Sequence, residues 1–358
     1  MSTRSPTRPI LLVGALFVSA CGSDAPDVRF IDDFIARSDL VECGPAPIAG
    51  RGEVLDAVAL GDTALLALYG STRELVAYDA RLRPAHVVPL AREGPAGVAE
   101  PVSAALGRDG IVYIADRGAR ALKRLDLARG TDRGAIRLPF TPHRVRTDGG
   151  GRVLVTPLVL GDEPSWLLYA IADAEAVGGG DAGGDVGGDD GPEPTPVRVP
   201  PTRYADLTVN ALANMTLPAA MPDGAVIAVH QFLVPAAFRA TAPDAEPVRH
   251  ALPLPDGVRA TVGRVPTTPI TEERLGEIAT AATALGVDRA RGGLLYLTRT
   301  GRADDAASEK AIVRLDRELD YERSYILDVN ATQLAYLADR GIALVADEEG
   351  TWHSCPTP

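Results

Sequence analysis

Apolar residues in this chain form short runs that are separated by glycine-containing turns. The stretch from Pro101 to Leu127 is the clearest example, with the segments VSAALG, IVYIAD and ALKRLDL. The turns between them contain Asp109-Gly110 and Arg117-Gly118. Runs of about six residues, either alternating or continuously apolar and bounded by such turns, are typical of strands in hairpins rather than of helices. This stretch therefore predicts a β-meander.

The same pattern recurs imperfectly along most of the chain. We identify about six units of roughly 40–60 residues, the length typical of blade-like repeats. They begin near Leu55, Pro101, His143, Asn210, Ala279 and Asn330. A single four-stranded unit cannot bury both of its faces, whereas units arranged around an axis bury them against one another. The repeat therefore predicts an all-β protein, a β-propeller of about six four-stranded blades.

Two segments interrupt the repeat. Residues 178–194, GGGDAGGDVGGDDGPEP, contain almost no apolar side chains, so we expect a disordered loop. Their likeness to glycine–aspartate calcium repeats is weak because the nine-residue period is missing. The segment that starts at Ile270 carries Thr271 as a candidate cap followed by Glu272 and Glu273, which predicts a short helix. Its end overlaps the first predicted strand of the fifth unit near Ala279.

The last unit has three strands, so the ring needs a fourth strand from elsewhere. The amino-terminal segment around VEC, just before Gly44-Pro45, is the candidate. Cys43 would then lie beside Cys355, at the distance between neighbouring strands that a disulfide accepts. We therefore expect a Cys43–Cys355 disulfide that closes the ring; two free thiols are the alternative.

The amino terminus has the features of an export signal. Arg4 and Arg8 precede the apolar run from Ile10 to Val18, which is shorter than the about 20 residues of a membrane span. Val18-Ser19-Ala20-Cys21 resembles a bacterial lipobox, which implies lipidation of Cys21. We expect a signal peptide at 1–20, a lipidated tether at 21–40 and the propeller at 41–358. The alternative is an ordinary signal peptide with a chance cysteine.

Composition and charge limit the classes of molecule that we expect this protein to bind. The formal net charge is -12, and no basic cluster occurs, which argues against nucleic acid as a partner. The lipobox resemblance implies membrane attachment through lipid, and Gly22 after the cysteine implies the outer membrane of a Gram-negative cell envelope. An envelope protein or a small ligand is the expected partner.

The second unit also resembles a known family. The wording REGPAGVAEPVSAALGRDGIVYIADRGARALKRLD is similar to six-bladed propellers of the NHL and TolB-like group. Only this unit, about 35 residues, carries the resemblance clearly. It implies a six-bladed ring and a ligand site at one axial end.

The search for chemistry gives no catalytic motif. The five histidines lack metal-ligand spacing, and no nucleophile elbow or phosphate-binding loop occurs. Ligand sites in propellers generally lie in the loops after the second strands. The corresponding candidates are Asp116, Arg117, Asp162, Glu163, His230, Gln231, Arg299, Asp347 and Glu348.

Two functions fit these candidates. Their carboxylates could hold a divalent cation, as in lactonase-like hydrolases of this architecture, or could be solvated turn residues. His230 could face the channel or be packed at a strand end. We therefore expect a lipid-anchored binding or interaction scaffold without a cofactor, and a metal-dependent hydrolase or lactonase-like enzyme is the alternative.

Overall fold

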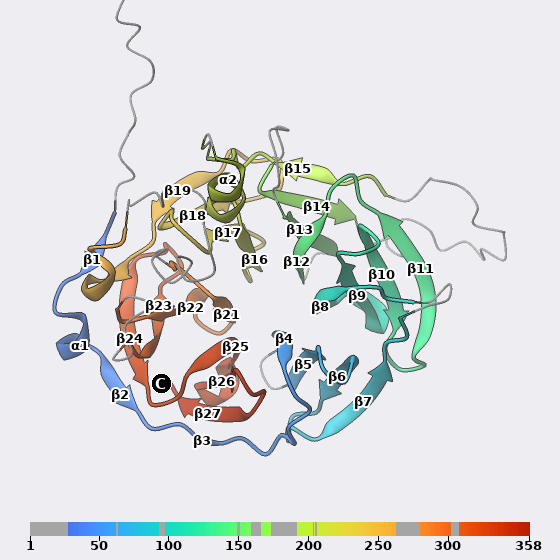
Figure 1. Ribbon diagram of the computed structural model, residues 1–358, viewed down its shortest axis with the longest axis horizontal. Helices are drawn as coiled ribbons and strands as arrows, with labels where there is room; N and C mark the ends of the chain where they lie inside the picture. Colours follow the sequence, from blue (N-terminus) through green and yellow to red (C-terminus); the bar gives the residue numbers. More distant parts are fainter. Residues whose placement is uncertain are drawn as a thin grey trace, which may run out of the picture.

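The protein is a six-bladed β-propeller. The computed structural model describes residues 28–61, 64–92, 97–148, 151–158, 166–172, 192–202, 204, 206–262, 280–301 and 308–358. Six sheets surround a central axis, and their first strands lie innermost (Figure 1). Each first strand contacts the first strand of the next blade, and β25 of the last blade contacts β4 of the first. The predicted fold class is confirmed.

Each blade is a meander whose strands pair antiparallel in chain order. The first blade contains β4 (Val54–Leu60), β5 (Ala64–Tyr69), β6 (Glu74–Tyr78) and β7 (Pro84–Pro89). The second contains β8 (Pro101–Leu106), β9 (Ile111–Asp116), β10 (Ala121–Asp126) and β11 (Thr131–Arg137). The third contains β12 (Pro142–Thr147), β13 (Arg152–Pro157), β14 (Leu168–Ala172) and β15 (Thr195–Val197).

The remaining blades follow the same plan. The fourth contains β16 (Thr216–Ala220), β17 (Val226–His230), β18 (Ala236–Ala240) and β19 (Val248–Ala251). The fifth contains β21 (Ala284–Asp288), β22 (Gly293–Arg299), β23 (Lys310–Leu315) and β24 (Tyr321–Leu327). The sixth contains β25 (Ala331–Leu337), β26 (Ile342–Asp347) and β27 (Trp352–Pro356).

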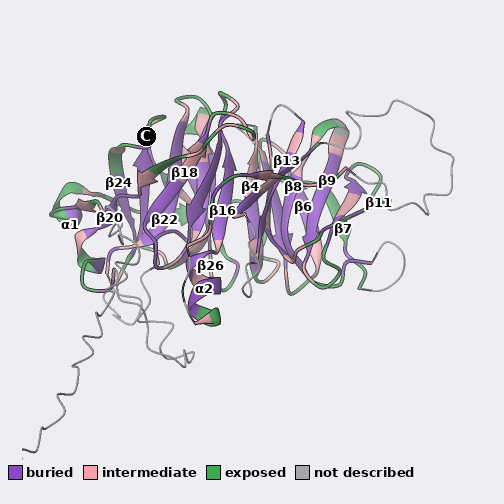
Figure 2. Ribbon diagram, turned by 90° about the horizontal axis from the view of Figure 1, so that it is seen from above, coloured by how far each residue is buried: buried purple, intermediate pink, exposed green. Residues whose placement is uncertain are grey.

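Hydrophobic layers between neighbouring blades hold the ring together. In β5, Leu65 and Ala67 pack toward the sixth blade, whereas Leu66 and Leu68 pack toward the second. Strands with both faces buried read as continuous apolar runs, which explains the run ALLALY. Burial is accordingly concentrated in the inner strands of the ring, and the outer strands and turns are more exposed (Figure 2).

The amino-terminal segment closes the ring as predicted and extends further than predicted. β3 (Gly44–Pro45) pairs with β27 and supplies the missing fourth strand of the sixth blade. β2 (Asp39–Val41) adds a fifth, parallel strand to the outer edge of the fifth blade. β1 (Phe30–Ile31) pairs with β20 (Leu254–Pro255), and the short helix α1 (Phe34–Arg37) lies between β1 and β2. We call residues 30–45 the amino-terminal strap (Figure 1).

Other sequence predictions need correction or lie outside the described residues. The fourth unit carries an unpredicted helix before its first strand: residues Leu207–Ala213 form α2, which Asp206 caps through the N–H groups of Thr208 and Val209, and the strand β16 follows from Thr216. The helix predicted from Ile270 lies outside the described residues up to Ala279, as does the glycine–aspartate segment up to Gly191. In the part of the chain that is described, no helix is long and apolar enough to cross a membrane.

Candidate functional site

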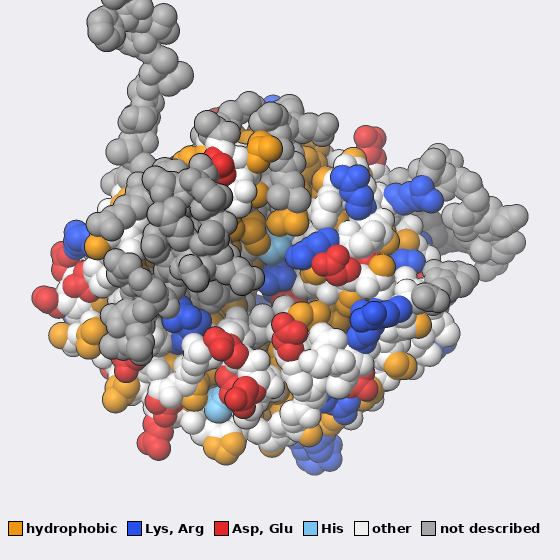
Figure 3. All heavy atoms as spheres, in the orientation of Figure 1, with side chains coloured by type: hydrophobic (Ala, Val, Ile, Leu, Met, Phe, Trp, Pro, Cys, Tyr) orange, Lys and Arg blue, Asp and Glu red, His pale blue; other side chains and the backbone are white. Residues whose placement is uncertain are grey.

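One end of the ring carries the loops that follow the second strands, together with α2; we call it the α2 face. A cavity of about 510 Å³ opens beside the axis on this face. It is lined mainly by blades one, two and three. Its lining residues are Glu53, Val54, Leu55, Gly70, Arg73, Arg92, Ala99, Glu100, Pro101, Val102, Arg117, His143, Arg144 and Gln333. Figure 3 looks onto the α2 face and shows basic side chains around the central hollow beside a few acidic ones.

The cavity contains four guanidinium groups in different settings. Arg73 donates to the backbone oxygens of Leu90 and Val98, so it holds the connection between the first two blades. Arg117 contacts the Glu100 carboxylate, with Nη1 and Oε1 3.1 Å apart, at a partly exposed position. Arg92 is exposed at the rim. These side chains give the cavity its positive character.

Arg144 lies on β12 and is partly buried. Its Nη1 donates to the Val102 carbonyl oxygen over 2.8 Å. Burial lowers the pKa of Arg144, and the nearby charges of Arg146 and Arg117 lower it further, while Asp56 partly offsets them. The guanidinium is therefore held in a place where positive charge is only partly compensated.

His143 is buried in the cavity wall. Its Nε2 donates to Gln231 Oε1 over 2.5 Å and so links the third blade to the fourth. Burial lowers the pKa of His143 from 6.5 to about 3. The imidazole is therefore neutral at physiological pH, and the charge of the cavity comes from the arginines.

A buried ion pair lies below the cavity. Arg146 Nη1 and Nη2 bind the two Asp56 carboxylate oxygens over 2.7 and 2.8 Å. Ser103 donates to the same carboxylate over 2.5 Å, so the first strands of three blades meet here. Burial opposes ionisation of Asp56, but Arg146 outweighs it, and the pKa of Asp56 is lowered.

A second, smaller cavity lies at the opposite end of the axis. Its volume is about 240 Å³, and its walls come from the ends of all six first strands. They are mostly aliphatic, including Val58, Leu106 and Leu285. Arg146 lines this cavity and Arg144 lines the first one, so the Asp56 ion pair lies between the two.

Two of the sequence-predicted site residues are structural turn residues. Asp116 accepts hydrogen bonds from the backbone N–H groups of Ala99, Glu100 and Ala119 over 2.9–3.2 Å. Asp347 accepts from Glu349 N and Thr351 N in the turn after β26, and from His353 Nε2. Both carboxylates therefore accept hydrogen bonds from the loop that follows their own strand or, for Asp116, also from the loop before β8.

The other candidates are dispersed. His230 is fully buried beneath α2, where Nδ1 contacts the Ala213 oxygen at 2.6 Å, so it packs rather than facing the channel. Glu348 accepts from Asn330 Nδ2 at 2.9 Å. Arg299 lies beside Lys310, whose pKa is lowered to about 8 by burial and then by the Arg299 charge.

The structure therefore brings only some of the predicted site residues together at the cavity. Arg117 lines the cavity, and Gln231 contacts its wall through His143. Asp162 and Glu163 lie outside the described residues, as does Cys21. Among the residues that are described, no group of three His, Cys, Asp or Glu side chains is placed to hold a metal ion.

Sequence reasoning missed Arg73, Arg92 and Arg144. Arg92 and Arg144 lie in the connection before a first strand or within one, whereas the prediction considered only the loops after second strands; Arg73 lies in such a loop, between β5 and β6, but was not singled out. The detectable signal was the pair Arg144 and Arg146 in HRVRTD, where alternate residues of a strand point to one side.

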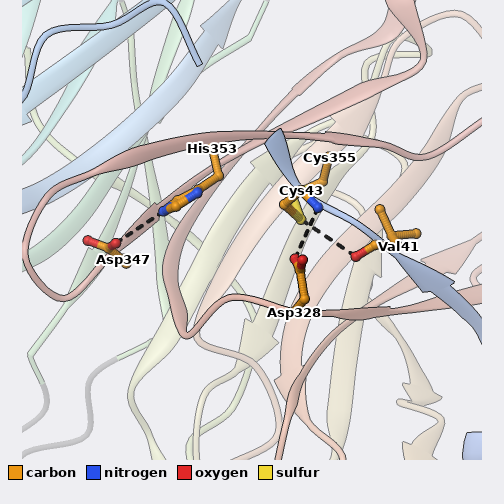
Figure 4. The surroundings of a disulfide bond; sticks show 6 residues. All are labelled: Val41, Cys43, Asp328, Asp347, His353 and Cys355. Atoms are coloured by element: carbon orange, nitrogen blue, oxygen red, sulfur yellow. Dashed lines mark hydrogen bonds and ion pairs between the residues drawn. A yellow bond between two sulfur atoms is a disulfide. The ribbon is translucent and has the colours of Figure 1, made fainter. Parts of the chain in front are cut away.

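The predicted disulfide is present. Cys43 and Cys355 are bonded, with their Cα atoms 4.4 Å apart (Figure 4). Cys43 stands immediately before β3, and its backbone N–H donates to Asp328 Oδ1 over 3.0 Å. The bond therefore attaches the amino-terminal strap to the last blade.

Comparison with known proteins supports the fold and no finer identity. No family model and no curated protein sequence matches the chain. A member of the DUF4221 family from Bacteroides vulgatus superimposes with a TM-score of 0.56 at 8% identity, covering 89% of this chain and 96% of that one. An exported protein from Bacteroides fragilis gives 0.52 at 10% identity, with 91% and 97% coverage. A streptogramin B lyase gives 0.50 at 13% identity, with 88% and 96% coverage.

Proposed function

We propose that this protein is a binding propeller whose ligand site is the cavity on the α2 face. The single observation that carries the proposal is that cavity: about 510 Å³, beside the axis, and walled by residues from several blades. Concave sites of this size in which several polar groups converge are common ligand sites of folded proteins. Val54, Leu55 and Val102 supply apolar wall here, and the arginines supply the polar groups.

We further propose that the protein works in the cell envelope, attached through lipid on Cys21. The lipobox-like Val18-Ser19-Ala20-Cys21 supports this, and so does a disulfide, which persists in oxidising compartments. The amino-terminal strap runs along the outside of the ring (Figure 1), away from the axis. A tether that enters there leaves the cavity accessible to a partner or ligand.

A capture experiment tests the binding function. The full chain, exported in its native host and cross-linked in the envelope, is compared with an Arg92→Glu variant at the cavity rim. Arg81→Glu is the matched control, because Arg81 is also exposed but lies on the β6–β7 turn, outside the cavity. We expect Arg92→Glu alone to reduce the captured material. Equal capture by all three proteins would contradict a ligand site in this cavity.

Lipid attachment is tested separately. A Cys21→Ser variant is expected to move from the detergent phase to the aqueous phase in phase partitioning, and to lose incorporation of labelled palmitate. Retention of the label by the variant would contradict attachment at Cys21.

A further inference from the structure

The charge of the α2-face cavity is opposite to that of the whole molecule. The chain has a formal net charge of -12. The cavity, by contrast, is lined by four arginines and two carboxylates, Glu53 and Glu100. A concave site of one sign concentrates ligands of the other sign, because low-dielectric walls focus the field. The local excess of positive charge therefore selects for anions.

Not all of these arginines are committed to structural contacts. Arg73 is used in holding two backbone oxygens. Arg117 shares its charge with Glu100, which is itself half exposed. Neither Arg92 nor Arg144 forms an ion pair with a carboxylate in the described part of the chain, and Asp56 is bound at both oxygens by Arg146 instead. Arg144 uses Nη1 for the Val102 carbonyl oxygen, so the exposed Arg92 and the rest of the partly buried Arg144 guanidinium remain for a ligand.

The Arg144 guanidinium is partly buried and lies near other positive charges. A buried charge normally has a partner, because desolvation penalises it. Arg144 has burial and two neighbouring arginines acting against its charged form. A bound carboxylate or phosphate would compensate it and would accept from a planar guanidinium in two-point geometry.

We propose that the cavity binds a small oxyanion, a carboxylate- or phosphate-bearing molecule, between the partly buried Arg144 and Arg117 and the exposed Arg92. This inference rests on the proposed function and adds the chemical class of the ligand. A cavity of about 150 Å³ takes benzene, so 510 Å³ accommodates on the order of twenty non-hydrogen atoms. The aliphatic side chains of Val54, Leu55 and Val102 would cover the uncharged part of such a ligand.

Calorimetric titration of the purified full chain tests the proposal. The probes are citrate for the carboxylate class, pyrophosphate for the phosphate class and glycerol as a neutral control. We expect citrate or pyrophosphate to bind with a Kd that rises with salt, and glycerol not to bind. The anion that binds more tightly identifies the class.

Substitutions locate the site. Arg144→Met keeps the aliphatic stem and removes the charge, and we expect at least a tenfold rise in Kd. Arg137→Met, at an exposed position on the outer strand β11, is the matched control and should leave Kd unchanged. If Arg144→Met fails to fold, Arg92→Glu at the exposed rim is used instead, and we expect the same rise in Kd.

Three outcomes would overturn the inference. They are no binding of either anion at millimolar concentration, equal Kd values for the wild type and both cavity variants, and weakened binding by Arg137→Met to the same degree. If Arg92→Glu still abolishes capture from the envelope while no anion binds, the proposed binding function stands and the oxyanion class fails. If anions bind but capture is unchanged, the binding function in the envelope fails instead.

Discussion

At the residue scale, the aspartates singled out above mainly hold the structure together through hydrogen bonds and ion pairs. Asp116 and Asp347 close connections by accepting backbone N–H groups, as their short side chains allow in turns. Asp56 instead joins three blades through Arg146 and Ser103. A carboxylate near a strand end in a propeller sequence is therefore a poor indicator of a ligand site, because the turns already require it.

The Asp56 ion pair gives the first prediction. Asp56→Asn leaves Arg146 buried without its countercharge, and breaking such a pair costs about 3–5 kcal/mol. Urea unfolding should show this loss, whereas Asp132→Asn at an exposed position of the outer strand β11 should stay within about 0.5 kcal/mol of the wild type. The double variant Asp56→Leu with Arg146→Met should recover much of the loss. No recovery would contradict the role given to the uncompensated charge.

The two buried histidines give a pH prediction. Burial lowers the pKa of His143 to about 3 and that of His230 to about 4, from 6.5. The unfolded chain therefore binds more protons than the folded one below pH 6.5, so stability falls as the pH falls through this window. Between pH 7 and 5 the two histidines together should reduce the free energy of unfolding by about 4 kcal/mol.

Unfolding by urea at pH 7 and pH 5 measures this effect. The difference between the two pH values should shrink by roughly half in His143→Gln and again in the double variant with His230→Gln. His86→Gln, at an exposed position, should leave the difference as in the wild type. An unchanged pH dependence in the double variant would show that other groups cause it.

At the scale of secondary-structure elements, the hydrophobic pattern predicted the strands of the blades, but it did not predict α2 or β2. The inner strands of a blade, such as β5 and β9, have apolar residues on both sides because both faces are covered, and the sequence shows this directly. Helix α2 was not predicted because it is only seven residues long and lies directly before the strand β16. β2 was missed because it is three residues long and depends on an edge of β24 almost 300 positions away.

The amino-terminal strap is expected to add measurable stability. Phe34 on α1 is fully buried against the fourth and fifth blades, in one cluster with Ile31 and Leu254. Phe34→Ala should therefore cost about 3–5 kcal/mol. Its neighbour Ile35 is 64% exposed, so Ile35→Ala should change stability by less than about 0.5 kcal/mol. Equal effects of the two substitutions would mean that the strap does not dock in solution.

At the scale of the whole molecule, closure joins the two ends of the described chain. β3 completes the sixth blade, and the disulfide links positions that are 312 residues apart. A ring whose first and last blades separate exposes the hydrophobic layer between them, which includes Leu65 and Trp352. The five other hydrophobic layers between neighbouring blades therefore depend on closure of the ring.

Removing the disulfide should lower stability without changing the fold. For a loop of this length the chain-entropy model gives at most about 5–6 kcal/mol. A Cys43→Ser, Cys355→Ser double variant should unfold at lower denaturant concentration than the oxidised wild type and should match the wild type measured under reducing conditions. Identical midpoints in oxidised and reduced wild type would contradict a stabilising role.

The sequence by itself determined the local structure and the way in which the ring closes. Strand periodicity, turn residues and the count of units depend on neighbours within a few positions, and the two cysteines outside the signal region left one pairing. Only the tertiary structure decided which side chains meet at the axis. Asp56 and Arg146 are 90 positions apart, and Arg144 and Arg117 come from different blades. Such convergence depends on how the first strands are arranged around the axis, and no local pattern in the sequence encodes that arrangement.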